Sequence, residues 1–320
     1  MKLRRVILLF LPLLGAVALL GLCFGSVSLS QLLAGEETAR IILLQLRLPR
    51  VAAGVLAGIG LSTAGVLLQT VTSNDLAGPN IIGVNSGAGL AVICLLTFLP
   101  GAGRLLPLGA FLGAFGAALL IAMAAGRLGA SRTGIVLIGI AVTTISNAAI
   151  SFLSLLDEGV LAQYNHFTVG SLKGVRMEDL LLPAALIFAA FLGSLGIGHS
   201  LGTLCLGDAA AAALGVRVKA LRITALALAA VSAAAVVSYA GLLGFVGLMV
   251  PHIGRALVGP RPRKLLIASA LVGAVLVVLA DLLGRVLAAP SELPVGILLS
   301  LVGGPYFLIL LVRRKRHAGI

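Results

Sequence analysis

Long apolar stretches, each about the length of a membrane-spanning helix, alternate with short polar segments along the whole chain. About 20 consecutive apolar residues cross the hydrocarbon core of a bilayer as a helix, which satisfies its own backbone hydrogen bonds in lipid. The pattern therefore predicts an all-α, polytopic membrane protein with about ten transmembrane helices in one domain, residues 1–320. The expected spans are 6–25, 51–70, 81–99, 105–126, 134–156, 180–198, 221–241, 244–258, 265–288 and 295–312.

The first span also has features of a secretory signal, because a basic segment, MKLRR, precedes an apolar run. Cys23 even suggests a lipoprotein cleavage site. Leu22, however, stands where such sites prefer a small residue, and the apolar run is long for a signal. We therefore expect a first helix that is retained.

Composition excludes a water-soluble domain. Hydrophobic residues make up 60% of the chain and charged residues 10%, and the mean hydropathy is +1.19. The 41 glycines recur at helical spacing. Examples are Gly54 and Gly58, Gly109 and Gly113, and Gly241, Gly244 and Gly247. Small residues let helix backbones approach closely in lipid, so this spacing predicts a compact bundle.

The distribution of Lys and Arg predicts the orientation of the helices. If ten helices alternate, sixteen of the 23 Lys and Arg fall in segments on the same side as the N-terminus. Basic residues concentrate in short cytoplasmic loops, so both termini are expected in the cytoplasm. The same bias explains the net charge of +13, so the charge does not indicate a nucleic-acid partner. We expect the basic C-terminal tail to lie at anionic lipid headgroups.

No catalytic, cofactor or metal motif is recognisable. The chain has neither an H-E-x-x-H zinc motif nor a phosphate-binding loop, and the spacing of its three cysteines suggests no disulfide or metal site. Ionisable residues inside the spans are also scarce, which disfavours a proton- or sodium-coupled transporter. The main exception is Asp281, and Arg285 four residues later makes a local ion pair the simplest interpretation.

The loop 199–223 contains a candidate coupling element on the cytoplasmic side. Asp208 suits a helix N-cap, five alanines favour a short helix, and Gly215 suits its end. A short helix with a small, uncharged face fits a groove on a cytoplasmic partner. An ordinary interfacial helix is the alternative that the residues themselves leave open.

Three arginines on the outer side, Arg47, Arg50 and Arg285, oppose the inside-positive bias. Exposed guanidinium groups suit carboxylates of a partner, or alternatively lipid headgroups. Pro49 cannot donate a backbone hydrogen bond and disfavours helix at the residue before it. The second helix is therefore expected to begin at about Pro49, with Arg50 in its first turn and Arg47 just outside.

Six stretches together resemble the FecCD-type permease subunits of ATP-binding-cassette importers, which take up ferric siderophores, haem and cobalamin. They lie in the expected order along almost the whole chain. The stretches are RLPR (47–50), NDLAGPNIIGVNSGAG (74–89), VGSL (169–172), LGDAAAAALGV (206–216), GLLGFVGLMVPHIGRALVGP (241–260) and ELPVGILLSLVGGPYFLILL (292–311).

The resemblance implies a homodimer in the bacterial inner membrane, two cytoplasmic ATPase subunits and an extracytoplasmic substrate-binding protein. It implies that the three outer arginines receive acidic residues of the binding protein. It assigns ATPase coupling to Asp208, Ala209, Ala210, Ala211, Ala212, Ala213, Leu214 and Gly215, and the inner gate to Ser131, Arg132 and Thr133. The helix order is also compatible with an inverted repeat of helices 2–5 and 7–10.

Two departures from the family pattern stand out. Asp75 replaces a proline that is usual in the loop after the second helix, and His166 and Phe167 precede the GSL motif where a tryptophan is common. We interpret the chain as the permease of an ATP-driven importer of a ferric siderophore or a related chelate. Cobalamin, haem and an oxyanion such as molybdate are other possible cargoes, and a stand-alone secondary transporter or an intramembrane enzyme are the alternative classes.

Overall fold

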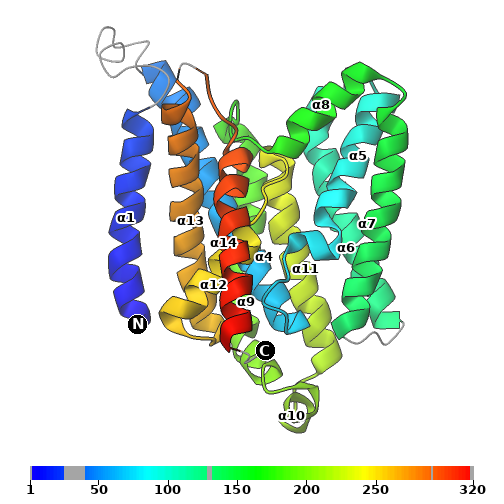
Figure 1. The fold of residues 1–320 in the computed structure, drawn as a ribbon, viewed down its shortest axis with the longest axis vertical. Coiled ribbons are helices and arrows are strands. Elements are labelled where there is room, and N and C mark those ends of the chain that lie inside the picture. Colours follow the sequence, from blue (N-terminus) through cyan, green and yellow to red (C-terminus); the bar gives the residue numbers. More distant parts are fainter. Residues whose placement is uncertain (1, 25–39, 128–131, 290, 318–320) are drawn as a thin grey trace.

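The computed structural model describes residues 2–24, 40–127, 132–289 and 291–317, and its regular elements are all helices (Figure 1). The elements in chain order are α1 (Leu3–Cys23), η1 (Ile42–Arg47), α4 (Leu48–Thr72), η2 (Pro79–Ile82), α5 (Val84–Phe98), η3 (Gly103–Leu105), α6 (Leu106–Arg127), α7 (Arg132–Ser154), α8 (Glu158–Val169), α9 (Met177–Leu204), α10 (Asp208–Ala213), α11 (Val218–Ala240), α12 (Val246–Val258), α13 (Pro262–Leu287) and α14 (Val295–His317).

Every predicted span coincides with a helix of the structure. Seven helices of the described chain are long and apolar enough to cross a membrane. Three shorter apolar helices, within α5, α12 and α14, occupy the other three expected spans. The all-α, polytopic fold class is confirmed, and a count of ten crossings stays a prediction.

The sequence analysis missed helix α8, which connects α7 to α9 at the end of the molecule opposite α10 (Figure 1). Asp157 caps it, because its carboxylate accepts the backbone N–H groups of Gly159 at 2.6 Å and Val160 at 3.3 Å. The segment mixes polar and apolar residues, so it gives no signal as a membrane span.

The core of the bundle forms around α4, α11 and α13, whose residues are largely buried. Helix α4 packs against α13, and α11 packs against both α4 and α6. In the numbering of the expected spans, α4 and α6 are helices 2 and 4, and α11 and α13 are helices 7 and 9. An inverted repeat of helices 2–5 and 7–10 therefore makes the α4–α13 pair equivalent to the α11–α6 pair. The packing therefore favours the inverted repeat.

Glycines occur where the helices approach most closely. A Cβ atom on Gly58 of α4 would overlap the backbone of Gly273 on α13, and one on Gly113 of α6 would overlap the backbone of Gly87 on α5. These contacts confirm the compact packing predicted from the glycine spacing.

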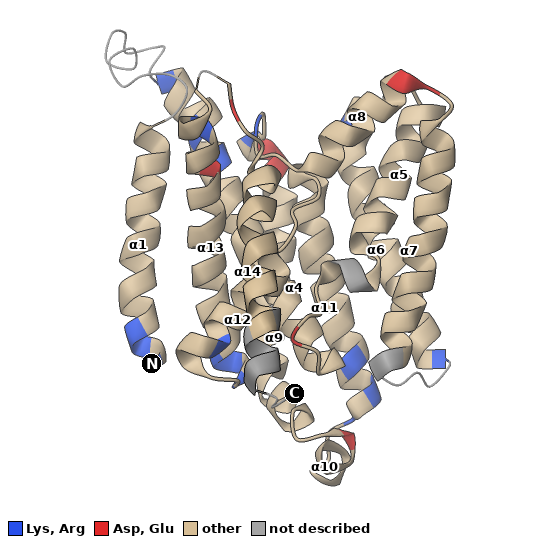
Figure 2. Ribbon diagram, viewed as in Figure 1, with Lys and Arg blue, Asp and Glu red and all other residues tan. Residues whose placement is uncertain are grey.

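The start of α1, the end of α14 and the short helix α10 all lie at one end of the molecule (Figure 1). Lys and Arg gather at this end, with few Asp or Glu among them (Figure 2). The arrangement agrees with the charge asymmetry in the sequence. We call it the basic end and the opposite one the outer end.

Candidate functional site

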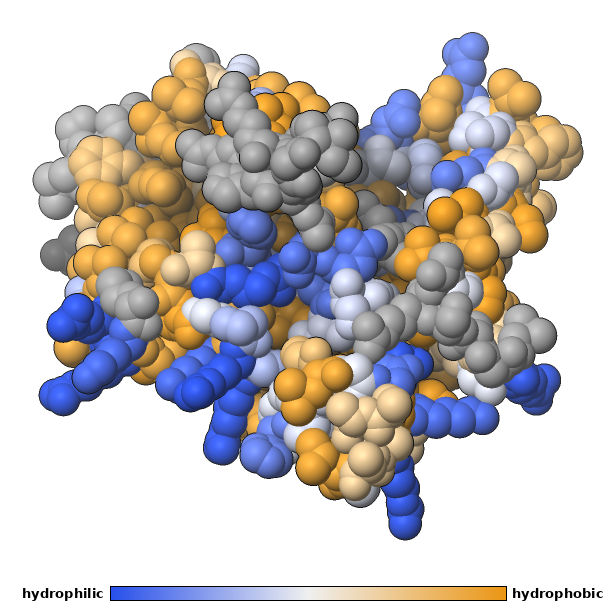
Figure 3. Space-filling view, turned by 60° about the horizontal axis from the view of Figure 1, so that its bottom comes forward, coloured by the Kyte–Doolittle hydropathy of each residue, from blue (hydrophilic) through white to orange (hydrophobic). Residues whose placement is uncertain are grey.

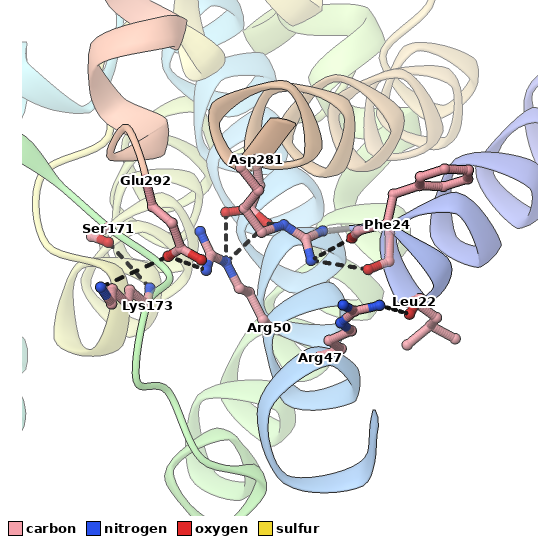
Figure 4. A network of polar contacts seen from close by, with 10 residues as sticks. Leu22, Phe24, Arg47, Arg50, Ser171, Lys173, Asp281 and Glu292 are labelled. Atoms are coloured by element: carbon pink, nitrogen blue, oxygen red, sulfur yellow. Dashed lines mark hydrogen bonds and ion pairs between the residues drawn. The ribbon is translucent and has the colours of Figure 1, made fainter. Parts of the chain in front are cut away.

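The three arginines expected at the outer side lie in one cluster: Figure 4 shows Arg47 and Arg50, and Arg285 shares Asp281 with Arg50. Arg47 ends η1, Arg50 lies in the first turn of α4, and Arg285 lies in the last turn of α13. Their exposed fractions are 5%, 8% and 2%, respectively. The prediction that they are exposed is therefore wrong, because the fold turns their guanidinium groups toward partners within the chain.

Arg50 joins three segments of the chain. Its Nε donates to both carboxylate oxygens of Asp281 at 2.9 and 3.0 Å, and its Nη1 donates to Glu292 Oε2 at 2.8 Å. Arg285 Nε lies 3.2 Å from Asp281 Oδ2, which confirms the predicted local ion pair. A buried charge is tolerated when it is paired in this way. The cluster thus ties α4 to α13 and to the segment before α14.

The other two arginines hold the end of α1. Arg47 Nη1 donates to the carbonyl oxygens of Leu22 and Cys23, both at 2.7 Å, and Arg285 Nη1 donates to that of Gly21 at 3.0 Å. The last carbonyls of a helix lack intrahelical partners and carry the negative end of its dipole, so cations stabilise them. These bonds make α1 an integral part of the bundle and favour a retained first helix.

The chain before Pro49 is helical and not extended, so α4 does not begin at the proline. The α-helix α4 begins at Leu48, but the π-helical segment η1 precedes it directly. The Leu48 N–H bonds to the Leu43 carbonyl, five residues back. The expected position of Arg47 outside a helix is therefore wrong. The wider π turn accommodates a proline that lacks an N–H and would crowd the carbonyl four residues before it.

A cavity of about 810 Å³ opens beside the arginine cluster. Arg47, Arg50 and Glu292 line it together with Lys173 and Arg176, whose side chains are 71% and 74% exposed. Lys173 Nζ lies 4.0 Å from Glu292 Oε2. Sequence analysis missed Glu292 and Lys173, although both lie in or beside motifs that carry the family resemblance.

The candidate coupling element at the basic end forms a helix, as predicted, in α10. Gly207 occupies the N-cap position, and Asp208 is the first helical residue. The prediction of Asp208 as N-cap is therefore wrong by one residue. Its carboxylate instead accepts two hydrogen bonds from Arg222 Nη2 on α11, at 2.8 and 2.7 Å. This ion pair fixes α10 to the start of α11.

The exposed face of α10 is small and apolar. Ala211 is fully buried within the chain, whereas Ala209, Ala210, Ala212 and Ala213 are exposed, as is 64% of Leu214. Gly215 ends the helix with φ +83°. Figure 3, in which this end comes forward, shows apolar surface bordered by hydrophilic side chains. Ala211 is thus unavailable to a partner, while its neighbours present a surface to one.

The structure describes two of the three residues expected at the inner gate. Ser131 falls outside the described residues, and Arg132 and Thr133 form the first turn of the helix. Asp75, the departure from the family pattern, has a partner in this structure: its Oδ1 lies 3.4 Å from Arg255 Nη2. Arg255 also donates to Gln69 Oε1. An ion pair to α12 therefore anchors the turn that lacks the usual proline.

Helix α7 carries a polar face that sequence analysis missed. Thr144, Asn147 and Ser151 are exposed and recur at i, i+3 and i+7, so they share one side of the helix. Polar side chains within the membrane usually face a water-filled cavity or another protein segment, not lipid tails. This face is a candidate lining for a path across the membrane.

A model of the FecCD transport family matches residues 11–313. The chain belongs to this family. The FecCD chain is similar to the iron(3+)-hydroxamate import system permease protein FhuG of Bacillus subtilis (strain 168), with 37% identity over 296 residues that cover 88% of each protein. It is also similar to the hemin transport system permease protein HmuU of Yersinia pestis, with 36% identity over 282 residues, or 86% of this chain and 84% of that protein.

A solved structure of a metal-chelate type ABC transporter in an inward-facing conformation shares this FecCD fold. The TM-score is 0.89 at 30% identity, and the match covers 97% of this chain and 99% of that one. The family resemblance inferred from the motifs is confirmed. The FecCD protein is a membrane-embedded permease subunit of an ABC importer and not itself an enzyme.

Proposed function

We propose that the protein forms the membrane path of an ATP-driven, binding-protein-dependent importer of a metal chelate, most directly a ferric siderophore. The names of its relatives support this class of cargo, with haem and cobalamin as related chelates. The polar face of α7 is the observation that carries the proposal, because a bulky hydrophilic chelate needs such a lining. ATP supplies the work through separate subunits, since the chain has no phosphate-binding loop.

Replacing Asn147 by Leu should reduce chelate uptake at least tenfold, because the variant removes the central polar group of this face and adds bulk to the path. Uptake of a radiolabelled ferric hydroxamate is measured in vesicles that contain permease, ATPase and binding protein. Ile145→Leu, an exposed apolar position on a different side of α7, is the control and should retain normal uptake. Equal uptake by Asn147→Leu would contradict the assignment of the path.

The same vesicles identify the cargo and the energy source. We expect uptake of the ferric hydroxamate to require ATP. Unlabelled hemin or cobalamin should reduce this uptake if it uses the same path. Uptake by the permease alone under a proton gradient would instead indicate a secondary transporter. The pairing of Asp281 with two arginines disfavours that alternative, because this carboxylate is already engaged.

We propose that the basic end faces the cytoplasm, which places both termini and α10 there. The excess of Lys and Arg at this end supports the orientation. In a variant whose Cys23 and Cys94 are replaced by Ala, an impermeant thiol reagent should label Cys205, which is exposed beside α10, only from the cytoplasmic side. Glu158→Cys in a cysteine-free chain should react only from outside. The reverse pattern would overturn the orientation.

We propose that the binding protein docks at the outer end, over the cavity beside Arg47, Arg50 and Arg285. Carboxylates of the partner meet Lys173 and Arg176 first, since these side chains extend into solvent. The buried arginines shape the floor of the cavity and add positive potential to it. A homodimer with its two-fold axis along the path would present two such cavities, one to each lobe of the partner.

Lys173→Glu combined with Arg176→Glu should weaken association with the binding protein and flatten its salt dependence. Rim charges act mainly on the encounter rate, and screening by salt reduces their effect. Binding kinetics are measured on detergent-solubilised permease at two salt concentrations. Arg127→Glu with Arg217→Glu changes the net charge equally at the basic end and should have no effect. If Lys173→Glu with Arg176→Glu leaves the salt dependence of association unchanged, the binding protein docks on other residues.

The remaining proposals concern assembly. We propose a homodimer in which the polar faces of two α7 helices line one path. Its inner gate comprises Arg132 and Thr133 in the first turn of α7, together with the preceding Ser131. Two ATPase subunits dock on the two copies of α10. The exposed alanines of α10 support its contact with the ATPase. The gate is supported by the start of α7, which lies at the same end of the molecule as α10 (Figure 1).

A further inference from the structure

A second cavity, of about 410 Å³, opens at the basic end where α1, α9 and α13 meet. Leu3, Leu206 and Ile267 give it apolar walls, and Gly198 and Gly202 of α9 leave space between the helices. It lies at the basic end, beside the first residues of α1 and α13 and the last turns of α9. The cavity is separate from the outer arginine cluster and from the polar face of α7.

Three cations line this cavity: Arg261, Arg263 and Lys264. All three are exposed. They surround the start of α13, whose N-cap residue makes no side-chain cap, so they oppose the dipole of this helix. The cavity therefore concentrates positive charge at a helix end that already carries a partial positive charge.

The chain itself offers this charge no counterion within the described residues. Asp208 of α10 pairs with Arg222, and Asp75, in the turn after α4, pairs with Arg255 of α12. Figure 3 shows hydrophilic side chains bordering the apolar surface of this end. An anion from outside the chain would complement the cations, and a ligand with apolar tails would also fill the walls.

We propose that this cavity binds an anionic phospholipid, with the phosphate between Arg261, Arg263 and Lys264 and the first acyl carbons against Leu3 and Ile267. Basic pockets between transmembrane helices bind such headgroups through charge-assisted hydrogen bonds. The bound lipid would join α1 to α9 and α13 at the basic end. The inference depends on the membrane placement of these helices and not on the identity of the cargo.

Native mass spectrometry of the full-length permease with added dioleoyl-phosphatidylglycerol or dioleoyl-phosphatidylcholine tests the proposal. We expect the anionic lipid to be retained selectively. Arg263→Gln with Lys264→Gln should weaken its binding by roughly 5- to 30-fold, the loss expected from two cations at an anionic headgroup. Arg127→Gln with Arg217→Gln, two exposed cations at the same end that do not line this cavity, is the control and should bind normally.

A second variant fills the cavity without changing its charge. A Cβ on Gly202 would lie 3.9 Å from Pro262 Cδ, an ordinary contact, so Gly202→Leu fits α9 and projects into the space. It should also lower binding of the anionic lipid, whereas diffuse surface attraction would not change. Size-exclusion chromatography and circular dichroism check that each variant is folded.

Several outcomes would overturn the proposal. These are unchanged lipid binding in the folded cavity variants, or an equal loss in the control pair. Displacement of the lipid by an equal concentration of inorganic phosphate would assign the cations to free phosphate. Retained lipid combined with loss of the ATPase subunit in Arg263→Gln with Lys264→Gln would assign this surface to the ATPase.

Discussion

Ala213→Arg should abolish ATP-coupled uptake while leaving the permease folded. Ala213 is exposed and lies on the side of α10 opposite the buried Ala211. A docked ATPase would enclose the new guanidinium without a counterion, and an unpaired buried charge costs several kcal/mol. A penalty of about 3 kcal/mol corresponds to a loss of roughly 100-fold in association. Uptake and ATP hydrolysis are measured together in vesicles.

Two further variants make this test specific. Ala213→Ser keeps the small size of the side chain and should support normal uptake. Ala211→Arg should instead destabilise the permease, because Ala211 is fully buried within its own chain. Normal coupled transport by a folded Ala213→Arg variant would show that α10 is an interfacial helix and not the ATPase contact.

Asp281→Asn should strongly destabilise the protein. The substitution keeps the shape of the side chain but removes the charge that pairs with Arg50 at 2.9 Å and with Arg285 at 3.2 Å. Removing one partner of a buried ion pair costs about 3–5 kcal/mol, because the remaining charge stays buried without compensation. Thermal unfolding of the detergent-solubilised permease, followed by size-exclusion chromatography, should show a clearly lower apparent melting temperature.

Glu178→Gln provides the matched control at the same end of the molecule. Glu178 pairs with Arg176 at 3.2 Å, but both side chains are more than 70% exposed, at 72% and 74%. Exposed ion pairs contribute little to stability, so this variant should have the same apparent melting temperature as the wild type. Equal melting of Asp281→Asn and the wild type would mean that the outer cluster is not a structural tie.

The sequence predicted the helices well because each span meets the same requirement independently. A stretch of apolar residues must be long enough to cross the bilayer and must satisfy its own backbone hydrogen bonds. No long-range contact has to be known for that inference. Helix α8 escaped it because this segment lies at the outer end and its composition is mixed.

The environment of the arginines could not be predicted in the same way. Arg50 finds its carboxylate 231 positions along the chain, and Arg47 binds backbone carbonyls of α1, which no side-chain motif marks. The unusual positions of these cations were evident, but their burial depends on tertiary packing. The polar face of α7 was also missed, although the helical spacing of Thr144, Asn147 and Ser151 in the sequence is a signal that could have revealed it.

The outer cluster has a consequence for how the chain enters the membrane during synthesis. Asp281 and Arg285 lie one turn apart on α13, so this helix can insert with its two charges paired. An unpaired charge raises the cost of inserting a membrane helix, whereas a paired one raises it less. Arg47 and Arg50 are synthesised long before Asp281, which follows Arg50 by 231 positions. Until Asp281 is available, we expect these arginines to stay at the aqueous interface of the membrane. The ribosome has therefore produced most of the chain before α1, α4 and α13 can be locked together.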